Sequence, residues 1–495
     1  MESLMQPLEK KLIELFEWHF KEVVNLWVPV KVHASYRKLY RLASANRSVI
    51  GVANSDRAEN IAFLEFSRHF RKIGLPVPEI YVEDLNNGLY LEEDLGDLTL
   101  YEALTKARAG TDDLPAEVEV LYKKVVRILP KFQIEGGKGL NYGLCYPRSS
   151  YDDQSIRWDL NYFKYNFLKL AGASRIGPVP FNEQKLEEDF QELIAFLMEA
   201  DSPYFLYRDF QSRNILLRED SQSGQLEPFF IDYQGGRRGA LQYDIASLLT
   251  QAKANLPLEA RKRLLEEYLE ALEAYIPVDR EVFIQHYQGF VLIRVLQTLG
   301  TYGLKGLHER KPYFLQSLPY ALHHLKQFLN TVQLPIKLPE LMNVLDAIVS
   351  AWDRREKSSS KNRLTVRVLS FSYHSSLPLD ETEHGGGFVF DCRCLPNPGR
   401  EAIYKKKSGL DAEVVEYLRK IPAVDEFLKH CFALVDQAVE AYILRKFTHL
   451  MICFGCTGGQ HRSVYAAECL ARHLREKYEV DVDLQHRELE RMNSL

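Results

Sequence analysis

The order of hydrophobic and polar residues along this chain predicts three regions with different secondary structure. In residues 1–97, short apolar runs such as 48–53 predict strands, and a charged amphipathic stretch at 58–72 predicts a helix. From 98 to 352, apolar residues recur three and four positions apart, which predicts a mostly helical region. Beyond residue 363 the two patterns alternate. Strands are predicted there at 364–372, 387–392 and 449–455, and helices at 411–445 and 463–478.

The domain organisation follows from these regions. A chain of 495 residues is too long for one ordinary hydrophobic core, so two or three domains are expected. The polar run D-R-R-E-K-S-S-S-K-N-R at 353–363 is typical of a linker. A β-rich small lobe (1–97) before a helical large lobe (98–352) is the layout of kinase-like folds. We therefore expect an α+β, kinase-like bilobal domain at 1–352, followed by a smaller α/β domain at 364–495.

Composition and charge narrow the class of protein. With 46% hydrophobic residues, 26% charged residues and a formal net charge of -5, the chain has the composition of a soluble globular protein, without overall basic character for nucleic-acid binding. Its first ten residues are polar, and no stretch approaches the ~18 consecutive apolar residues of a membrane span. We expect a cytoplasmic protein with no membrane association, and its oligomeric state is left open.

The seven cysteines, six of them after residue 390, raise two alternatives. A disulfide framework would require a secreted context, which the N-terminus does not indicate. Cys392-x-Cys394 and Cys453-x-x-Cys456 together have the spacing of a zinc site. Cys453, however, falls inside an apolar, strand-like run, where a thiol usually packs in the core. We favour packed thiols over zinc.

The strongest chemical signal is the run Y-R-D-F-Q-S-R-N at 207–214. Asp209 and Asn214 are five residues apart, so one loop can present a carboxylate to an acceptor hydroxyl and an amide oxygen to a metal ion. Asp232 follows an apolar run and adds an oxygen ligand suited to Mg²⁺. Asp244 opens an amphipathic stretch, where a carboxylate can stabilise the loop from a helix start. Together these residues predict phosphoryl transfer.

These residues resemble those of the aminoglycoside phosphotransferase-like superfamily, relatives of the protein kinases, over roughly residues 10–350. The resemblance implies ATP and Mg²⁺ as cofactors, Asp209 as the catalytic base, and Asn214 and Asp232 as metal ligands. Tyr207 stands where the family usually has His, at a mainly architectural position, so activity is still expected. The run 48–53 lacks the Lys that usually pairs with the nucleotide phosphates.

Bacterial anomeric kinases for N-acetylmuramate and N-acetylglucosamine also lack that Lys. This chain resembles them in S-Y-R-K-L-Y (35–40), L-E-E-D-L-G (91–96) and R-V-L-Q-T-L-G-T-Y-G-L (294–304). The resemblance implies an anomeric hydroxyl of an N-acetylhexosamine as acceptor. The residues that would hold the ATP phosphates are Ser35, Arg37 and Lys38; the alternative for them is a solvated strand edge. The region 141–167, rich in Tyr, Trp, Asp and Asn, either lines the acceptor site, with Asp159 as first choice for a hydroxyl contact, or packs helices.

A second candidate site is the run G-C-T-G-G-Q-H-R-S at 455–463, between a predicted strand and a predicted helix. Successive N–H groups at a helix N-terminus, with two glycines and an Arg, are suited to binding phosphate. The C-x5-R-S spacing is also that of cysteine phosphatases, in which a thiolate attacks the bound phosphate ester. Both readings follow from local chemistry.

The wider segment resembles the C-terminal domain of RapZ over about 365–490, through H-G-G-G-F-V-F-D-C-R-C-L-P-N-P-G-R, K-K-K-S-G-L-D and F-G-C-T-G-G-Q-H-R-S-V-Y. In that family the domain senses glucosamine 6-phosphate and binds small regulatory RNA. Gly399 stands where the family often has His, which leaves the ligand open. The resemblance implies a sugar-phosphate or other anion site formed by Asp391, Arg393, Cys456, Thr457, Gly458, Gly459, His461 and Arg462.

Two classes of function follow. The leading prediction is an ATP-dependent kinase of a small-molecule sugar whose C-terminal domain binds a sugar-phosphate effector; an aminoglycoside or choline is an alternative acceptor. The second class is a RapZ-type RNA-binding adapter with a ligand-sensing kinase-like region. RNA is not the favoured partner, because Asp209, Asn214 and Asp232 are all intact.

Overall fold

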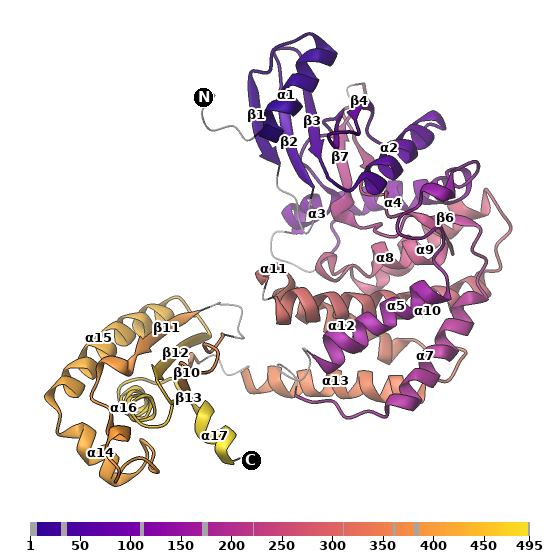
Figure 1. The fold of residues 1–495 in the computed structure, drawn as a ribbon. Coiled ribbons are helices and arrows are strands. Elements are labelled where there is room, and N and C mark those ends of the chain that lie inside the picture. The colour runs from indigo at the N-terminus through magenta and orange to yellow at the C-terminus, as the bar shows by residue number, and fades with distance from the viewer. Residues whose placement is uncertain are drawn as a thin grey trace. The chain divides into compact units, whose positions relative to one another are not determined.

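The computed structural model describes residues 7–30, 37–108, 113–170, 177–220, 222–309, 311–359, 363–380 and 386–493. The chain divides into two compact units, residues 1–350 and 351–495 (Figure 1). Each unit has hydrophobic clusters of its own, so each is described by itself. No helix within the described ranges is long and apolar enough to cross a membrane.

The small lobe of the first unit is an antiparallel five-stranded sheet with the order β1-β2-β3-β5-β4. Its central strand β3 is buried on both faces: Val49 and Ala53 pack with helix α1, whereas Ile50 and Val52 belong to the cluster that contains α2. This alternation is the two-residue period of a strand. The elements are α1 (Pro7–Phe20), β1 (Leu26–Val30), β2 (Lys38–Ala43), β3 (Ser48–Ala53), α2 (Arg57–Lys72), β4 (Ile80–Asp84) and β5 (Leu89–Glu93).

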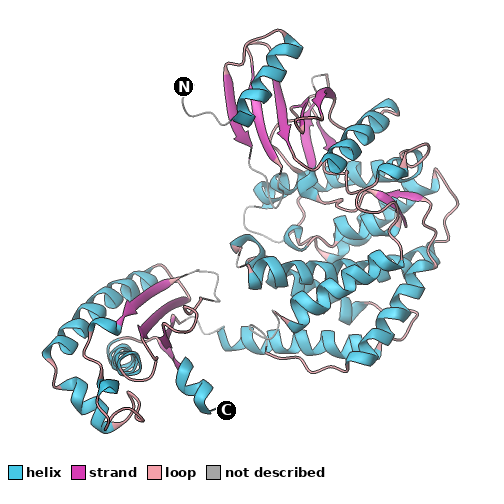
Figure 2. Cartoon of the chain, viewed as in Figure 1, coloured by secondary structure: helices cyan, strands magenta, loops and turns pink. Residues whose placement is uncertain are grey.

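The large lobe is mostly helical, as predicted (Figure 2). Two short antiparallel strand pairs interrupt the helices and carry the loops of the candidate site. The helices are α3 (Leu100–Arg108), α4 (Ala116–Pro130), α5 (Asp153–Phe163), α7 (Glu183–Met198), α8 (Gln242–Leu249), α9 (Leu258–Glu273), α10 (Arg280–Thr301), α11 (Pro312–Leu315), α12 (Leu318–Thr331) and α13 (Pro339–Ser359). One pair is the hairpin of β7 (Ile215–Glu219) and β8 (Leu226–Phe230), and the other joins β6 (Tyr204–Leu206) to β9 (Arg237–Gly239) across that hairpin.

The second unit contains a parallel four-stranded sheet with the order β11-β12-β10-β13. The central strands β10 and β12 are buried over most of their length, and β12 is a nearly continuous apolar run, which is typical of parallel strands that are covered on both faces. The elements are β10 (Thr365–Ser372), β11 (Gly387–Asp391), α14 (Ala412–Arg419), α15 (Pro422–Leu444), β12 (His449–Cys456), α16 (Arg462–Lys477), β13 (Asp481–His486) and α17 (Arg487–Asn493).

Two predicted boundaries were wrong. Residues 353–359, assigned to a linker, are the last turns of α13, because Arg, Glu and Lys are polar residues that also form helices well. The single helix predicted at 411–445 is two helices, α14 and α15, which are separated at Pro422. Proline lacks a backbone N–H and clashes with the preceding turn, so it begins a helix more readily than it continues one.

Candidate active site

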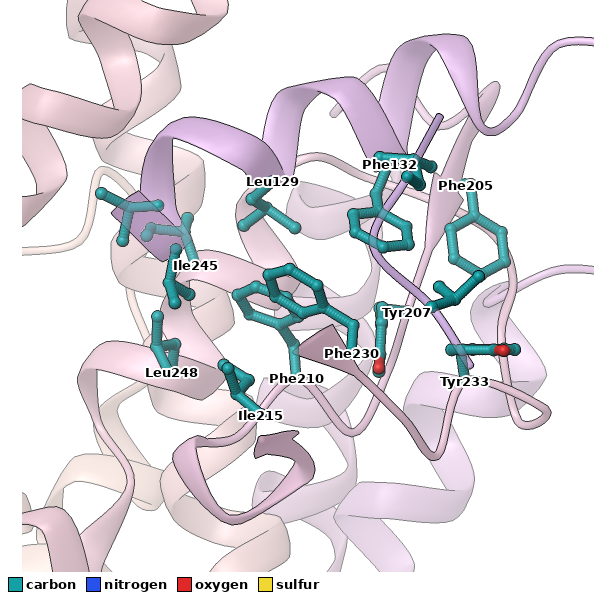
Figure 3. Packing of buried hydrophobic residues seen from close by; sticks show 14 of the residues in the cluster. Leu129, Phe132, Phe205, Tyr207, Phe210, Ile215, Phe230, Tyr233, Ile245 and Leu248 are labelled. Atoms are coloured by element: carbon teal, nitrogen blue, oxygen red, sulfur yellow. The ribbon is translucent and has the colours of Figure 1, made fainter. Parts of the chain in front are cut away.

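Two loops of the large lobe are held in place by aromatic side chains beside their acidic residues. Tyr207 and Phe210 flank Asp209 and are buried, and Phe230 is buried two residues before Asp232. The rings of Phe210 and Phe230 stack with their centroids 5.7 Å apart (Figure 3). Because these rings share one core, the two loops have a fixed relation to each other. Asp209 and Asp232 are half-buried, at the edge of that core.

The hairpin of β7 and β8 brings Asn214 and Asp232 together. Asn214 immediately precedes β7, and Asp232 follows the end of β8; the pairing of Ile215 with Phe230 places these two ends side by side. The Asn214 amide Nδ2 donates to Asp232 Oδ2 at 3.0 Å and to the backbone oxygen of Asp209 at 2.8 Å. The amide nitrogen has two hydrogens, and both are used, so the Asn214 oxygen is the atom that can serve a cation.

The first loop contains a strained turn that Asp244 stabilises. Arg208 has a φ of 77°, and the N–H of Asp209 donates to the backbone oxygen of Tyr207 at 3.1 Å, which closes a three-residue turn. Such backbone typically costs about 1–3 kcal/mol. Asp244, in the first turn of α8, accepts hydrogen bonds from the N–H groups of Tyr207 at 2.8 Å and Arg208 at 2.9 Å. Burial raises the pKa of Asp244 to about 7, although these hydrogen bonds oppose the shift.

The guanidinium of Arg37 lies between two carboxylates. Its Nη2 is 2.8 Å from Asp232 Oδ1 and 3.4 Å from Glu59 Oε1. The Gln234 amide Nε2 donates to the same two oxygens, at 2.9 Å and 3.3 Å. Burial raises the pKa of Asp232, Arg37 opposes that rise, and the nearby charge of Asp209 adds to it. One polar cluster therefore joins α2, the residue before β2 and the loop after β8.

Of the residues predicted to hold nucleotide phosphates, Arg37 lies in this cluster. Lys38 is the exposed first residue of β2 and pairs with the last residue of β3, and Ser35 lies outside the described residues. Arg37 immediately precedes Lys38, so it lies beside the end of β3, the strand that lacks a Lys. Glu59 and Gln234 were not predicted. Their only local signals are the position of Glu59 in the first turn of α2 and that of Gln234 close behind an acidic residue.

In the second unit, the loop 457–461 joins β12 to α16, and its tip is exposed. Thr457 and Gly458 are exposed, and a Cβ added at Gly458 would meet no described atom within 4 Å. Arg462, the first residue of α16, is 4% exposed. Its guanidinium donates to the backbone oxygens of Arg393 at 3.1 Å and Leu395 at 2.9 Å, and its Nη2 is 3.5 Å from the Thr457 hydroxyl. Thr457, Gly458 and Arg462 thus lie together.

Three other predicted members of this site have partners within the protein. Asp391 and Arg393 form an ion pair, with Arg393 Nη2 2.7 Å from Asp391 Oδ2. The pKa of Asp391 is lowered, first by the hydrogen bond from the Arg393 side chain. His461 is nearly buried, and its Nε2 lies 2.9 Å from the backbone oxygen of Tyr404. A ligand at this loop would therefore meet His461 already oriented and Arg393 already paired.

Cys392, Cys453 and Cys456 pack in the interior of the second unit, whereas Cys394 is exposed. Cys456 is 3% exposed, and its sulfur is 3.1 Å from the Ser463 hydroxyl. Cys453 is fully buried. Gly459 has a φ of +64°, and a Cβ there would lie 2.8 Å from the backbone nitrogen of Ser372, so only glycine fits. Among the described residues, no group of three or more His, Cys, Asp and Glu is arranged to hold a metal ion. The enclosed thiol of Cys456 does not support the cysteine-phosphatase alternative.

A five-stranded small lobe, a helical large lobe and acidic loops between them define a kinase-like phosphotransferase fold followed by a smaller α/β domain. The comparison with known families agrees. Residues 34–282, about half of the chain, match the phosphotransferase enzyme family, and the chain belongs to that family. Residues 364–490 match the RapZ C-terminal domain.

Among curated relatives, a nucleotide-binding protein of Saccharophagus degradans is 28% identical over 250 residues, which are 50% of this chain and 77% of that protein. A nucleotide-binding protein of Thermotoga neapolitana is 40% identical over 129 residues, which are 26% of this chain and 44% of that protein. The chain thus spans less than half the length of the second relative.

Among solved structures, a choline kinase from Cryptosporidium parvum is similar, with a TM-score of 0.45 and 13% identity over 68% of this chain and 99% of that chain. Spectinomycin phosphotransferase in complex with ADP and spectinomycin has a TM-score of 0.42 and 13% identity, over 70% of this chain and 99% of that chain.

Proposed function

We propose that the first unit is an ATP-dependent phosphotransferase that acts on a hydroxyl of a small molecule. The observation that carries the proposal is the meeting of Asp209, Asn214 and Asp232 at one edge of a shared aromatic core. Family membership supports the same class of reaction. In relatives of this fold, catalysis consists mostly of positioning and of stabilising charge.

Asp209 would act as the base. Its carboxylate would accept the proton of the acceptor hydroxyl while the hydroxyl oxygen bonds to the γ-phosphorus of ATP. The bond from that phosphorus to the β–γ bridging oxygen then breaks, and ADP leaves. The turn at Arg208 and the two hydrogen bonds to Asp244 support this role, because they fix the backbone that presents Asp209.

The residues around Asp232 fit a magnesium ion. Mg²⁺ prefers hard oxygen ligands and is commonly bound through one or two carboxylates together with phosphate and water. Asp232 supplies a carboxylate, and Asn214 supplies an amide oxygen because its nitrogen is already used. Arg37, 2.8 Å from Asp232, shows that a positive charge is stable at this carboxylate. Bound there, Mg²⁺ would offset the negative charge of the transferred phosphate.

The nucleotide phosphates would meet basic residues of the small lobe. Arg37, together with Lys38 and Ser35, is the proposed set. The contact of Arg37 with Glu59 of α2 supports this set, because Glu59 holds the guanidinium in position before a phosphate binds to it. Arg37 would exchange Asp232 for a phosphate oxygen when ATP binds.

For the acceptor we propose a sugar hydroxyl, and first the anomeric hydroxyl of an N-acetylhexosamine. The support is the resemblance of the first unit to anomeric kinases and of the second unit to a domain that senses an amino-sugar phosphate. Aminoglycosides and choline are the competing acceptors.

The test is ATP turnover by the full chain with a panel of sugars, aminoglycosides and choline. An N-acetylhexosamine should raise turnover, and Asp209→Asn should lower it by about 10²–10⁴-fold, the usual contribution of a general base. Asp201→Asn, the same change at an exposed position, serves as control and should be neutral. If no acceptor raises turnover above that of Asp209→Asn, the proposal fails.

A second candidate function concerns the loop 457–461 of the second unit. We propose that it binds an anion such as a sugar phosphate, supported by the buried Arg462 beside the exposed Thr457 and Gly458 at the start of α16. Exposed N–H groups at a helix start favour phosphate. The match of residues 364–490 to the RapZ C-terminal domain agrees with a ligand-binding role.

Calorimetric titration of the full chain with glucosamine 6-phosphate tests this second function. Arg462→Gln should abolish binding, whereas Arg472→Gln, an exposed residue of the same helix, should not. A gel-shift with small RNAs at several salt concentrations tests the alternative of an RNA-binding adapter. Specific contacts with RNA phosphates should weaken as the salt concentration rises. Salt-sensitive RNA binding without sugar-phosphate binding would favour the adapter.

A further inference from the structure

A chain of polar side chains crosses the interior of the large lobe between α5, α8 and α10. Arg294 donates to the Tyr243 hydroxyl at 2.9 Å and to the Gln297 amide oxygen. The Gln297 nitrogen donates to Asp159 Oδ1 at 3.1 Å, and the Tyr151 hydroxyl donates to Asp159 Oδ2 at 2.7 Å. The rings of Tyr151 and Tyr243 lie 4.8 Å apart. We call these five residues the α5–α10 network.

The α5–α10 network lies next to the loop of Asp209. Tyr243 is followed on α8 by Asp244, and Asp244 holds the backbone N–H groups of Tyr207 and Arg208. The charge of Asp209 is also felt by Arg294, whose pKa is raised: burial works against that rise, and Tyr243 and Asp209 are the first groups that outweigh it. Through Asp244, the network is therefore joined to the backbone of the loop that carries Asp209.

Within the network, one buried donor has no hydrogen-bond partner, whereas the acceptor oxygens of Asp159 both have one. Both oxygens of Asp159 already accept a hydrogen bond from the protein. Arg294 is only 6% exposed, and its Nε–H has no partner among the residues that the structure describes. A buried donor without a partner typically costs about 1–3 kcal/mol. A ligand group that offers an oxygen would recover this cost, whereas a ligand group that offers N–H would not.

The surrounding charges point the same way. Arg237 is 1% exposed, and its guanidinium donates to the backbone oxygens of Gly235 and Tyr146. Burial lowers the pKa of Arg237 to about 10, and the charge of Arg208 adds to that effect. Arg208, Arg237 and Arg294 are therefore gathered around Tyr243 and Asp159, whose charges act on the pKa of all three. An ammonium group brought beside them would meet like charge.

We propose that the α5–α10 network is the specificity wall for the acceptor, and that it selects a sugar whose substituent beside the reacting hydroxyl is an amide or carboxylate oxygen, not an ammonium group. The inference rests on the proposed phosphotransferase function. Arg294 donates to that oxygen, and Gln297 holds Arg294 and Asp159 in register. The network reaches the surface at Gln297, which is half-buried. Trp158, beside Asp159, is 46% exposed.

The test compares N-acetylglucosamine, glucosamine and glucose, which differ only at carbon 2, at a pH where the amine is protonated. For the wild-type chain, kcat/KM should be at least about tenfold higher for N-acetylglucosamine than for glucosamine, the size of one hydrogen bond to a charged group. Arg294→Gln should abolish most of this ratio and leave the KM for ATP unchanged. Arg280→Gln, on the exposed first turn of the same helix, should keep the ratio.

The outcomes separate this inference from the function on which it rests. If no sugar raises turnover above that of Asp209→Asn, the phosphotransferase proposal itself fails. If sugars are phosphorylated but glucosamine equals or exceeds N-acetylglucosamine, or if Arg294→Gln keeps the ratio, only the specificity wall is overturned. If a thermal unfolding experiment shows that Arg294→Gln does not fold, Gln297→Leu takes its place, because it removes the hydrogen bond between Gln297 and Arg294 at a half-buried position. Gln297→Leu must then also lower the ratio of kcat/KM for N-acetylglucosamine to that for glucosamine.

Discussion

The guanidinium of Arg37 contacts the carboxylate of Asp232 at 2.8 Å, although 195 residues separate them in the chain. The same guanidinium is 3.4 Å from Glu59. In protein kinases, a Lys on the third strand pairs with a helix Glu, and a separate Asp holds the metal. Here one Arg, placed before β2, contacts a carboxylate of helix α2 and the acidic loop after β8 at once. Under the proposed function, Arg37 would take the place of the Lys that β3 lacks.

Replacing Arg37 should therefore weaken nucleotide binding. A hydrogen bond to a charged group contributes about 1.5–3 kcal/mol, so Arg37→Met should raise the KM for ATP by about 10- to 100-fold. Steady-state kinetics against ATP measure this change, and Arg47→Met, at the exposed pair with Glu22, is the control. A lower KM for ATP in Arg37→Met would instead mean that the Arg37–Asp232 pair only blocks the site.

Removal of the metal ligands should change the magnesium dependence of turnover. EDTA should stop ATP turnover by the wild-type chain, and Asp232→Asn should raise the Mg²⁺ concentration for half-maximal activity by at least about tenfold. Asp220→Asn, in the turn at the other end of the same hairpin, should leave that concentration unchanged. Equal Mg²⁺ dependence in Asp232→Asn and the wild type would remove Asp232 as a ligand.

Asp244 should make stability depend on pH. Its pKa is raised from 3.8 to about 7 in the folded chain, so its contribution to stability is fully present below about pH 3.8 and is lost as the pH rises to about 7. The three-unit shift corresponds to about 4 kcal/mol at most. Urea unfolding at pH 5 and pH 8 should show a smaller loss of stability in Asp244→Asn than in the wild type.

The comparison needs a control for the other carboxylates that titrate in this range. Asp201→Asn changes an exposed residue of the same lobe and should follow the wild-type pH profile. Parallel profiles for Asp244→Asn and the wild type would show that the two backbone hydrogen bonds keep Asp244 charged throughout.

Gly300 permits the close contact of α10 with α5. A Cβ at Gly300 would lie 2.8 Å from the Tyr162 ring and 2.9 Å from its backbone carbonyl carbon, which cannot move aside alone. Gly300→Ala should therefore lower the free energy of unfolding by about 1–3 kcal/mol, the usual cost of overpacking. Val282→Ala, at an exposed position near the start of the same helix, should have little effect. A thermal unfolding midpoint that is unchanged in Gly300→Ala would contradict the contact.

Local patterns predicted much of the first unit. The apolar run at 48–53 and the three- and four-residue spacing after 98 each describe a single element, because burial acts directly on such local patterns. The errors fall at boundaries: polar residues after 352 continue α13, and Pro422 divides one predicted helix. Composition alone could not distinguish a polar helix from a linker after residue 352. It also could not locate the break between the two helices at Pro422.

By itself, the sequence determined the kinase-like fold class and the spacing of Asp209, Asn214 and Asp232, because local periodicity and short loops express both directly. Only the tertiary structure decided that Arg37 would meet Asp232 and Glu59, and that Asp159, Gln297 and Arg294 would form one chain of hydrogen bonds. These contacts join residues far apart in the chain. Which of them form depends on how helices and strands pack around the core, and no local pattern contains that information.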